Sequence, residues 1–436
     1  MALIHPQSQE CAKTELDIFC VPYTQHSITK NTYHEIHPIS AITGTAPIEF
    51  HLSGSSEEYI DLNDTYLCVR AKIANADGTN LAADAEVGFV NYPGCSLFSQ
   101  VDIQLGDRLV TQASNTYPYR GVIECLLNYS PDTLDTQFAC ALFAKDTAAH
   151  MEVTDPAGAN NGLKQRSVNT ILSRTVDIIT PIHSDMFFQE KLLINGVDIK
   201  IKFVRAKDEF CLMSSAAGDA PKVVILSASL YIKKVAIAPG VLLAHARTLA
   251  QSNAKYPIDR VCIKTASIPT GSRICNQENL FLGQLPKFII IGFVDHEAFT
   301  GSYRRNPFNF KHYDLEFMNI HTDGQAYPGR PFQPSFNTNQ YGREYYQMIQ
   351  ATGRQLKDRS LAITPFDFAN GYTLYCFNLE PDGGSGGHVS VIRTGNVRLE
   401  ARFRVALART VNMVCYAVYD SVIEISNSRQ VLVDHY

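Results

Sequence analysis

The chain has 436 residues, of which 45% are hydrophobic and 19% are charged, with a formal net charge of −5. This composition excludes a disordered chain, and the length suits two domains of about 200 residues each. The sequence contains no run of five or six basic residues, so we expect no condensation of nucleic acid through its phosphates and no sequence-specific nucleic-acid binding.

The start of the chain lacks the basic and apolar segments of a secretion signal, and the longest clean apolar run, Phe288 to Val294, is too short to span a membrane. We therefore expect a protein that stays inside the cell that makes it and is not secreted through a signal peptide. The sequence does not decide whether the protein contacts a membrane. The eleven cysteines form no Cys-x-x-Cys pair, and we expect reduced, buried thiols such as Cys68 and Cys415.

Residues 1–45 are expected to form an N-terminal arm. Three aromatic residues, Phe19, Tyr23 and Tyr33, are spaced among polar residues, and Pro22 interrupts any helix. Two interpretations remain open: the segment extends and docks onto a neighbour, or it is the first strand of the following domain. In the first case, these three aromatic residues are the candidate assembly contacts.

Alternation of apolar and polar residues predicts strands along most of the remaining chain. Leu67, Val69, Ala71 and Ile73 alternate with polar or small residues, as do Val101, Ile103 and Leu105. Turn dipeptides separate these runs, which is typical of an antiparallel sandwich or barrel. The expected turns are Asp77-Gly78, Gly106-Asp107, Asn195-Gly196, Asp323-Gly324 and Gly395-Asn396.

Helical patterns are few. Pro118 to Leu127 begins with a proline and places its aliphatic residues on one face, and a second helix is expected at Tyr341 to Ile349. Val241 to Gln251 predicts a helical connector that stops before Pro257. We therefore expect a first domain at 46–240, a helical linker at 241–256 and a second domain at 257–436.

The two halves of the chain resemble each other. Val197 to Phe203 has the same apolar and polar order as Val397 to Phe403, and an Asn-Thr-led helix comes earlier in each half, after Asn115 and after Asn337. Matched order and matched turns indicate a duplicated β-domain. The sequence therefore predicts an all-β fold of two tandem eight-stranded antiparallel jelly-roll sandwiches, with a few short helices in the loops.

Ser302 to Gly324 gathers charged groups and histidines that could suggest an active site. Alternation instead predicts a half-buried strand that runs into the Asp323-Gly324 turn. His312, Asp314 and Glu316 are then expected to point away from the core, opposite Tyr313, Leu315 and Phe317.

Other motifs give no catalytic or metal site. Gly383 to Gly387 matches Gly-x-Ser-x-Gly, but no helix pattern follows it, so a surface loop is expected. His34 and His37 are three residues apart, whereas the zinc helix motif needs four, and Pro38 opposes a helix. We expect no catalytic residue, no metal and no cofactor.

Several longer segments are more specific than generic strand patterns. They are Asp17-Ile18-Phe19, Pro47 to His51, Tyr59 to Leu62, Ser114 to Arg120, Leu193 to Asp198, Asn279 to Lys287, Ser302 to Tyr313, Asn370 to Tyr375 and Val431 to Asp434. In these segments the chain resembles the double jelly-roll major capsid protein, or hexon, of Polinton/Maverick elements and adintoviruses, and the resemblance runs nearly end to end.

The resemblance implies a structural, non-enzymatic protein that forms homotrimers and packs against neighbouring capsomers and a minor capsid or penton protein. It also implies assembly inside the host cell and a location in the icosahedral shell of the virion. Two alternatives are a carbohydrate- or cell-surface-binding double sandwich and a host-retained endogenous copy of a capsid gene.

Overall fold

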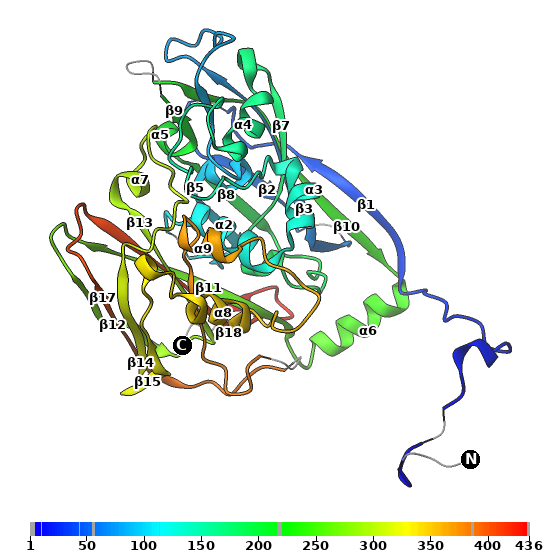
Figure 1. Ribbon diagram of the computed structural model, residues 1–436. Coiled ribbons are helices and arrows are strands. Elements are labelled where there is room, and N and C mark those ends of the chain that lie inside the picture. The colour runs from blue at the N-terminus through cyan, green and yellow to red at the C-terminus, as the bar shows by residue number, and fades with distance from the viewer. Residues whose placement is uncertain are drawn as a thin grey trace.

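A computed structural model describes residues 5–9, 11–42, 44–54, 57–112, 114–215, 220–384 and 388–433. Two β-sandwiches pack directly against each other, and an N-terminal segment extends away from them from near the start of helix α6 (Pro239–Leu249) (Figure 1). Each sandwich contains two antiparallel sheets whose four main strands follow the same order, and one sheet of the second sandwich has a fifth strand. The chain therefore has the double jelly-roll fold that its sequence predicts.

The first sandwich has one sheet in the order β1-β10-β3-β7 and a second in the order β2-β8-β5-β6. The short strands β4 (Val87–Phe89) and β9 (Leu212–Ser214) pair separately. The eight sandwich strands are β1 (Ile28–Ile36), β2 (Ile48–Leu52), β3 (Tyr59–Ala74), β5 (Phe98–Leu105), β6 (Arg108–Leu109), β7 (Val176–Pro181), β8 (Ile199–Arg205) and β10 (Lys222–Ile237).

The second sandwich repeats this arrangement, with sheets in the orders β11-β18-β13-β16 and β12-β17-β14-β15. A last strand, β19 (Val431–Val433), adds to the end of β18. The eight sandwich strands are β11 (Ala254–Ile268), β12 (Ile274–Gln284), β13 (Phe288–Asp295), β14 (Leu315–Thr322), β15 (Gln325–Phe332), β16 (Tyr375–Asn378), β17 (Thr394–Phe403) and β18 (Val411–Ile425).

The matched segments of the two halves occupy equivalent places. β8 and β17, which contain most of the two matched Val-to-Phe segments, are each the second strand of the second sheet. The two Asn-Thr-led helices, α2 (Tyr117–Asn128) and α8 (Gly342–Ala351), both lie between the fifth and sixth sandwich strands of their halves. The other helices are short loop elements: α1 (Pro93–Ser96), α3 (Pro131–Thr136), α4 (Asn161–Val168), α5 (Asp208–Cys211), α7 (His296–Thr300) and α9 (Pro365–Ala369).

The core of each sandwich follows from the alternation of its strands. Leu67, Val69, Ala71 and Ile73 of β3 are at most 1% exposed, and they face the inner side of their sheet. Burying one such side chain contributes about 1.5–3 kcal/mol, so the alternation fixes which face of each strand is internal.

The N-terminal arm expected at 1–45 is shorter than predicted. Residues 28–36 form β1, which pairs antiparallel with β10, so the first sandwich begins at residue 28 rather than at residue 46. The sandwich needs this strand because β10 would otherwise leave a long edge of unpaired backbone groups. Of the two open interpretations, a first strand is correct for residues 28–36.

The linker expected at 241–256 also differs. Its helix, α6, spans Pro239–Leu249, and β11 already begins at Ala254, so Pro257 lies inside a strand. Proline is tolerated there because β11 is an edge strand and pairs along one side, with β18.

Two local predictions are wrong. The first is the start of the strand that was expected to include His312, Tyr313 and Asp314. This strand, β14, begins only at Leu315, because Tyr313 and Asp314 adopt left-handed backbone conformations, with φ of 48° and 51°. Gly395-Asn396 is not a turn but part of β17. A side chain at Gly395 would overlap the carboxylate of Asp323, so glycine there allows β17 to approach the Asp323-Gly324 turn closely.

The hairpin expected at Asp323-Gly324 is present between β14 and β15, with both residues at positive φ.

None of the described helices has the length and apolar character needed to cross a bilayer.

Candidate functional site: the seam between the sandwiches

The seam between the two sandwiches is built around α2, an unusually buried helix. Pro118 stands in its first turn, where a missing N–H costs little, and the residues from Tyr117 to Leu127 are all buried. Most of them are apolar and pack into the core. Two of them, Arg120 and Glu124, are charged and stand one turn apart on the same face.

Arg120 and Glu124 form the centre of a buried polar cluster. The Arg120 guanidinium lies 2.9 Å from Glu124 Oε1 and 2.7 Å from Asp185 Oδ1. The second carboxylate oxygen of Glu124 lies 2.6 Å from Nδ1 of His183, whose Nε2 is 2.7 Å from the Tyr92 hydroxyl. Each charged group therefore has partners close enough to replace the water that it loses on burial.

The electrostatics of the cluster favour an ionised Glu124. Burial alone opposes ionisation of this carboxyl, but Arg120 and the hydrogen bonds from His183 and Tyr416 outweigh it and lower its pKa from 4.5 to about 2. Burial also opposes the charge on Arg120, but Glu124 and Asp185 raise its pKa. At Asp185 burial dominates, and the pKa is raised despite the neighbouring Arg120.

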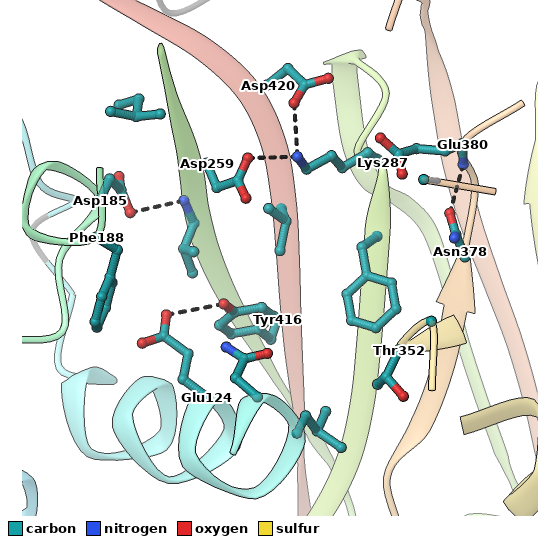
Figure 2. A pocket seen from close by; sticks show the side chains of 18 of the residues that line it. Glu124, Asp185, Phe188, Asp259, Lys287, Thr352, Asn378, Glu380, Tyr416 and Asp420 are labelled. Carbon is teal, nitrogen blue, oxygen red and sulfur yellow. Dashed lines mark hydrogen bonds and ion pairs between the residues drawn. The ribbon is translucent and has the colours of Figure 1, made fainter. Parts of the chain in front are cut away.

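The same cluster connects the first sandwich to the second. The hydroxyl of Tyr416, on β18, donates to Glu124 Oε1 at 3.0 Å, and the backbone N–H of Val261, on β11, donates to Asp185 Oδ1 at 3.2 Å. Figure 2 shows α2 facing these two strands, with Tyr416 reaching down to Glu124. These directional contacts fix how the two sandwiches are rotated against each other.

A second buried polar cluster lies farther along the seam. Arg166, on α4, is fully buried and its guanidinium lies 2.6 Å from Asp146 Oδ1. The other carboxylate oxygen of Asp146 accepts a hydrogen bond from Asn306 of the second half at 2.8 Å, and the hydroxyl of Tyr372 donates to its backbone carbonyl at 2.7 Å. One loop of the first half is thus bound by two segments of the second.

The stretch Ser302 to Tyr313, singled out in the sequence, is part of this seam. Phe308 and Phe310 are buried, and their rings lie 5.8 and 6.3 Å from the ring of Tyr119, on α2. Such edge-to-face contacts add to the burial of the aromatic rings. The stretch is therefore structural, as the sequence predicts, and it joins the two sandwiches before the expected half-buried strand, β14, leads into the Asp323-Gly324 turn.

The trio His312, Asp314 and Glu316 does not form a shared site. The His312 ring stacks on Phe336 at 3.9 Å between centroids, and its Nδ1 accepts a hydrogen bond from the backbone of Asp314. Burial lowers the pKa of His312. The expectation that His312 points to solvent is therefore wrong, because the turn at 313–314 brings its ring against the sandwich.

A cleft of about 950 Å³ opens between α2 and strands β11, β13 and β18 (Figure 2). Lys287 lies in it with its amine 2.5 Å from Asp259 Oδ1 and 2.8 Å from Asp420 Oδ1. Burial alone would lower the pKa of Lys287, but these two carboxylates raise it. Lys287 therefore stays protonated and is a partner in an ion pair, not a base or a nucleophile.

The other motifs weighed in the sequence lie apart from the seam. His34 contacts the Thr32 hydroxyl, whereas His37 contacts Ser229. Of Gly383 to Gly387, residues 385–387 lie outside the described residues. Within the described part of the chain, no group of three or more His, Cys, Asp or Glu side chains is arranged to hold a metal ion.

The three candidate assembly contacts occupy different places. Tyr33 lies in β1, 48% exposed, with its ring 5.8 Å from that of Tyr66 on β3. Phe19 and Tyr23 lie in the segment before β1 and are almost completely exposed. The structure does not bring the three together.

Sequence reasoning missed the seam clusters. One signal for the first was available: Arg120 and Glu124 are an i, i+4 pair inside an otherwise apolar helix, which indicates a buried ion pair. The remaining members, Asp185, His183 and Tyr416, come from distant parts of the chain. No spacing within the sequence connects them.

No family model matches the chain. A Caenorhabditis elegans protein described only as uncharacterized is 23% identical over 428 residues, which cover 95% of this chain and 99% of that protein.

Solved structures of viral capsid proteins match the fold from end to end. The Sputnik virophage structure aligns with a TM-score of 0.69 at 14% identity, covering 99% of this chain and 94% of that one. The PBCV-1 capsid model aligns with a TM-score of 0.60 at 12% identity over 96% and 99% of the two chains, and the mavirus major capsid protein with 0.58 at 12% identity over 100% and 95%. The chain therefore has the double jelly-roll fold of viral major capsid proteins.

Proposed function

We propose that this protein is a structural, non-enzymatic major capsid protein. The observation that supports the proposal best is the alignment of 99% of the chain with 94% of a virophage capsid chain, both sandwiches included. A chain that shared a single sandwich with these proteins would support only a general β-sandwich function. Here the pairing of two sandwiches, and not only each sandwich, is the shared feature.

The proposed assembly is a homotrimer in which six sandwiches form a pseudo-hexagonal capsomer. Such a unit needs its two sandwiches held at a constant angle, because an error in the angle would accumulate across the shell. The buried clusters around Glu124 and Asp146 supply that rigidity. Neighbouring capsomers and a minor capsid or penton protein are the proposed partners, and the virion is the proposed location.

We also propose a division of the chain that follows its strands. Residues up to 27 form the arm, residues 28–238 the first jelly roll, α6 the linker, and the residues from 254 onward the second jelly roll.

The solution mass of the purified protein tests the proposal. Three chains of 48.4 kDa give a species of about 145 kDa, and we expect this mass to persist at raised salt because obligate interfaces are large and mostly apolar. Negative-stain images should then show hexagonal particles or closed shells. A monomer that stays monomeric at high concentration would contradict the proposal.

A second candidate role keeps the fold and changes the context. The end-to-end relative in a nematode favours a capsid gene of the Polinton/Maverick or adintovirus type that resides in an animal genome. A retained copy that has lost assembly would form capsomers but no shells, or would form no capsomers at all. Binding of the soluble monomer to glycans would instead favour the carbohydrate-binding alternative.

A further inference from the structure

The segment before β1 exposes a dense set of large apolar side chains. Each is at least 73% exposed, and Figure 1 shows the segment extending away from both sandwiches. A soluble protein rarely leaves such a cluster uncovered, so the segment is a candidate contact surface. We call residues 16–23 the apolar arm, and its large apolar members are Leu16, Ile18, Phe19, Val21 and Tyr23.

The exit of the arm from the body is well defined. The side chain of Gln25 bonds both the N–H and the carbonyl of Ile28, at 3.1 and 3.2 Å. The Ser27 carbonyl accepts a hydrogen bond from Ala238, directly before α6. These contacts direct the arm away from its own sandwich at the point where α6 begins.

Helix α6 has little cover from its own chain, although Leu242 packs against the core and His245 contacts Tyr59. Of its eleven residues only Leu249 is buried, and Leu243 is 55% exposed. An isolated helix of this length is marginal in water, so a partner that packs on it would stabilise it.

A mainly apolar groove of about 440 Å³ adjoins the C-terminal half of α6. Lys191 and Lys255 lie among its lining residues and are exposed. The start of the arm has the opposite charge, because Asp17 lies in the arm and Glu15 directly precedes it. The apolar side chains that line the groove are Tyr59, Leu192, Ile194, Ile237, Leu249, Ala254 and Tyr256.

We propose that the apolar arm of one copy binds the groove and the exposed side of α6 on a second copy. This inference rests on the proposed assembly of several copies and names one of its contacts. Phe19 and Tyr23 enter the groove, and the carboxylates of Glu15 and Asp17 approach Lys191 and Lys255. From Ser27 to Phe19 an extended chain spans about 26 Å, which is enough to cross to a neighbouring subunit.

Disulfide trapping tests this contact directly. Cys20 stands next to Phe19 in the arm, and the other exposed thiols, Cys11 and Cys140, are replaced by serine. In that background Ser252→Cys places a thiol in the lining of the groove. As the matched control, Asp135→Cys places an exposed thiol on α3, outside the groove.

We expect mild oxidation of the Ser252→Cys protein to give covalent dimers and larger species on non-reducing gels, which Cys20→Ser abolishes and which the Asp135→Cys control lacks. A disulfide within one chain would overturn the inference, since the arm would then fold back on its own groove. Equal cross-linking of both variants, or none, would also overturn it.

A second variant removes the apolar contacts without engineered thiols. Phe19→Ser with Tyr23→Ser should shift the mass distribution from trimers and larger assemblies toward smaller species, whereas Leu356→Ser, at an equally exposed site, should leave it unchanged. If the wild-type protein is trimeric and the arm variant forms the same trimers and larger assemblies, the arm contact is refuted but the proposed capsomer is not. A wild-type protein that is monomeric throughout would instead refute the proposed capsomer.

Discussion

At the scale of single residues, the seam depends on groups that would be costly to bury alone. Glu124 contacts Arg120 and His183 of its own sandwich and Tyr416 of the other. Removing one partner of a buried charge leaves the others unpaired, which costs more than the lost contact itself.

We therefore expect Glu124→Gln to destabilise the protein by about 3–5 kcal/mol, because it leaves the Arg120 charge incompletely paired. Tyr416→Phe removes one hydrogen bond and should cost about 1–2 kcal/mol. Urea unfolding at a fixed protein concentration measures both. Equal effects of the two substitutions would contradict this account of the cluster.

The pKa of Glu124 gives a dependence of stability on pH with a defined sign. The folded-state pKa of about 2 lies below the unfolded value near 4.5, so the stabilisation is complete above about pH 4.5 and is lost as the pH falls toward 2. The full effect is about 3 kcal/mol. The difference in unfolding free energy between wild type and Glu124→Gln should therefore shrink from pH 6 to pH 3, and a constant difference would contradict the assignment.

At the scale of elements, close packing explains one residue that helix propensity disfavours. Gly121 lies inside α2, where a side-chain Cβ would overlap Sγ of Cys95 on α1. Alanine normally stabilises a helix interior relative to glycine. The contact between α1 and α2 reverses that preference.

Gly121→Ala should accordingly lower the melting temperature and cost about 1–3 kcal/mol through overpacking. Gly342→Ala, at the start of α8, provides the matched control because a Cβ there meets no atom within 4 Å. We expect that control to be neutral or slightly stabilising in thermal unfolding. A stabilised Gly121→Ala protein would show that α1 and α2 separate easily.

At the scale of the whole molecule, the seam makes the two sandwiches one cooperative unit. Buried contacts join α2 to β11 and β18 at one place and the loop of Asp146 to Asn306 at another. Separating the sandwiches would expose both clusters and the aromatic rings between them, so one sandwich should not unfold while the other persists.

We expect a single calorimetric transition for the folded chain, with fluorescence and circular dichroism changing together. A double substitution of Glu124→Gln with Asn306→Ala weakens both clusters and should separate the transition into two. Two transitions in the wild-type protein would show that the seam is weaker than its contacts indicate.

The local pattern of apolar, polar and turn-forming residues in the sequence determined most of the fold. Alternation in β3, the turn at Asp323-Gly324 and the helix at Tyr117–Asn128 follow from side-chain periodicity and backbone preference, which act within a few residues. The repeated order of strands and loops was sufficient to predict two sandwiches, because equal patterns bury equal faces.

What only the tertiary structure decided is where distant segments meet. Residues 28–36 became a strand because β10 offered an unpaired edge, and Pro257 was accepted in β11 because that strand is itself an edge. Glu124 and Tyr416 are 292 positions apart and meet only because the two sandwiches pack together. Periodicity records which side of a strand is buried but not which partner covers it, so the seam could not be predicted from the sequence.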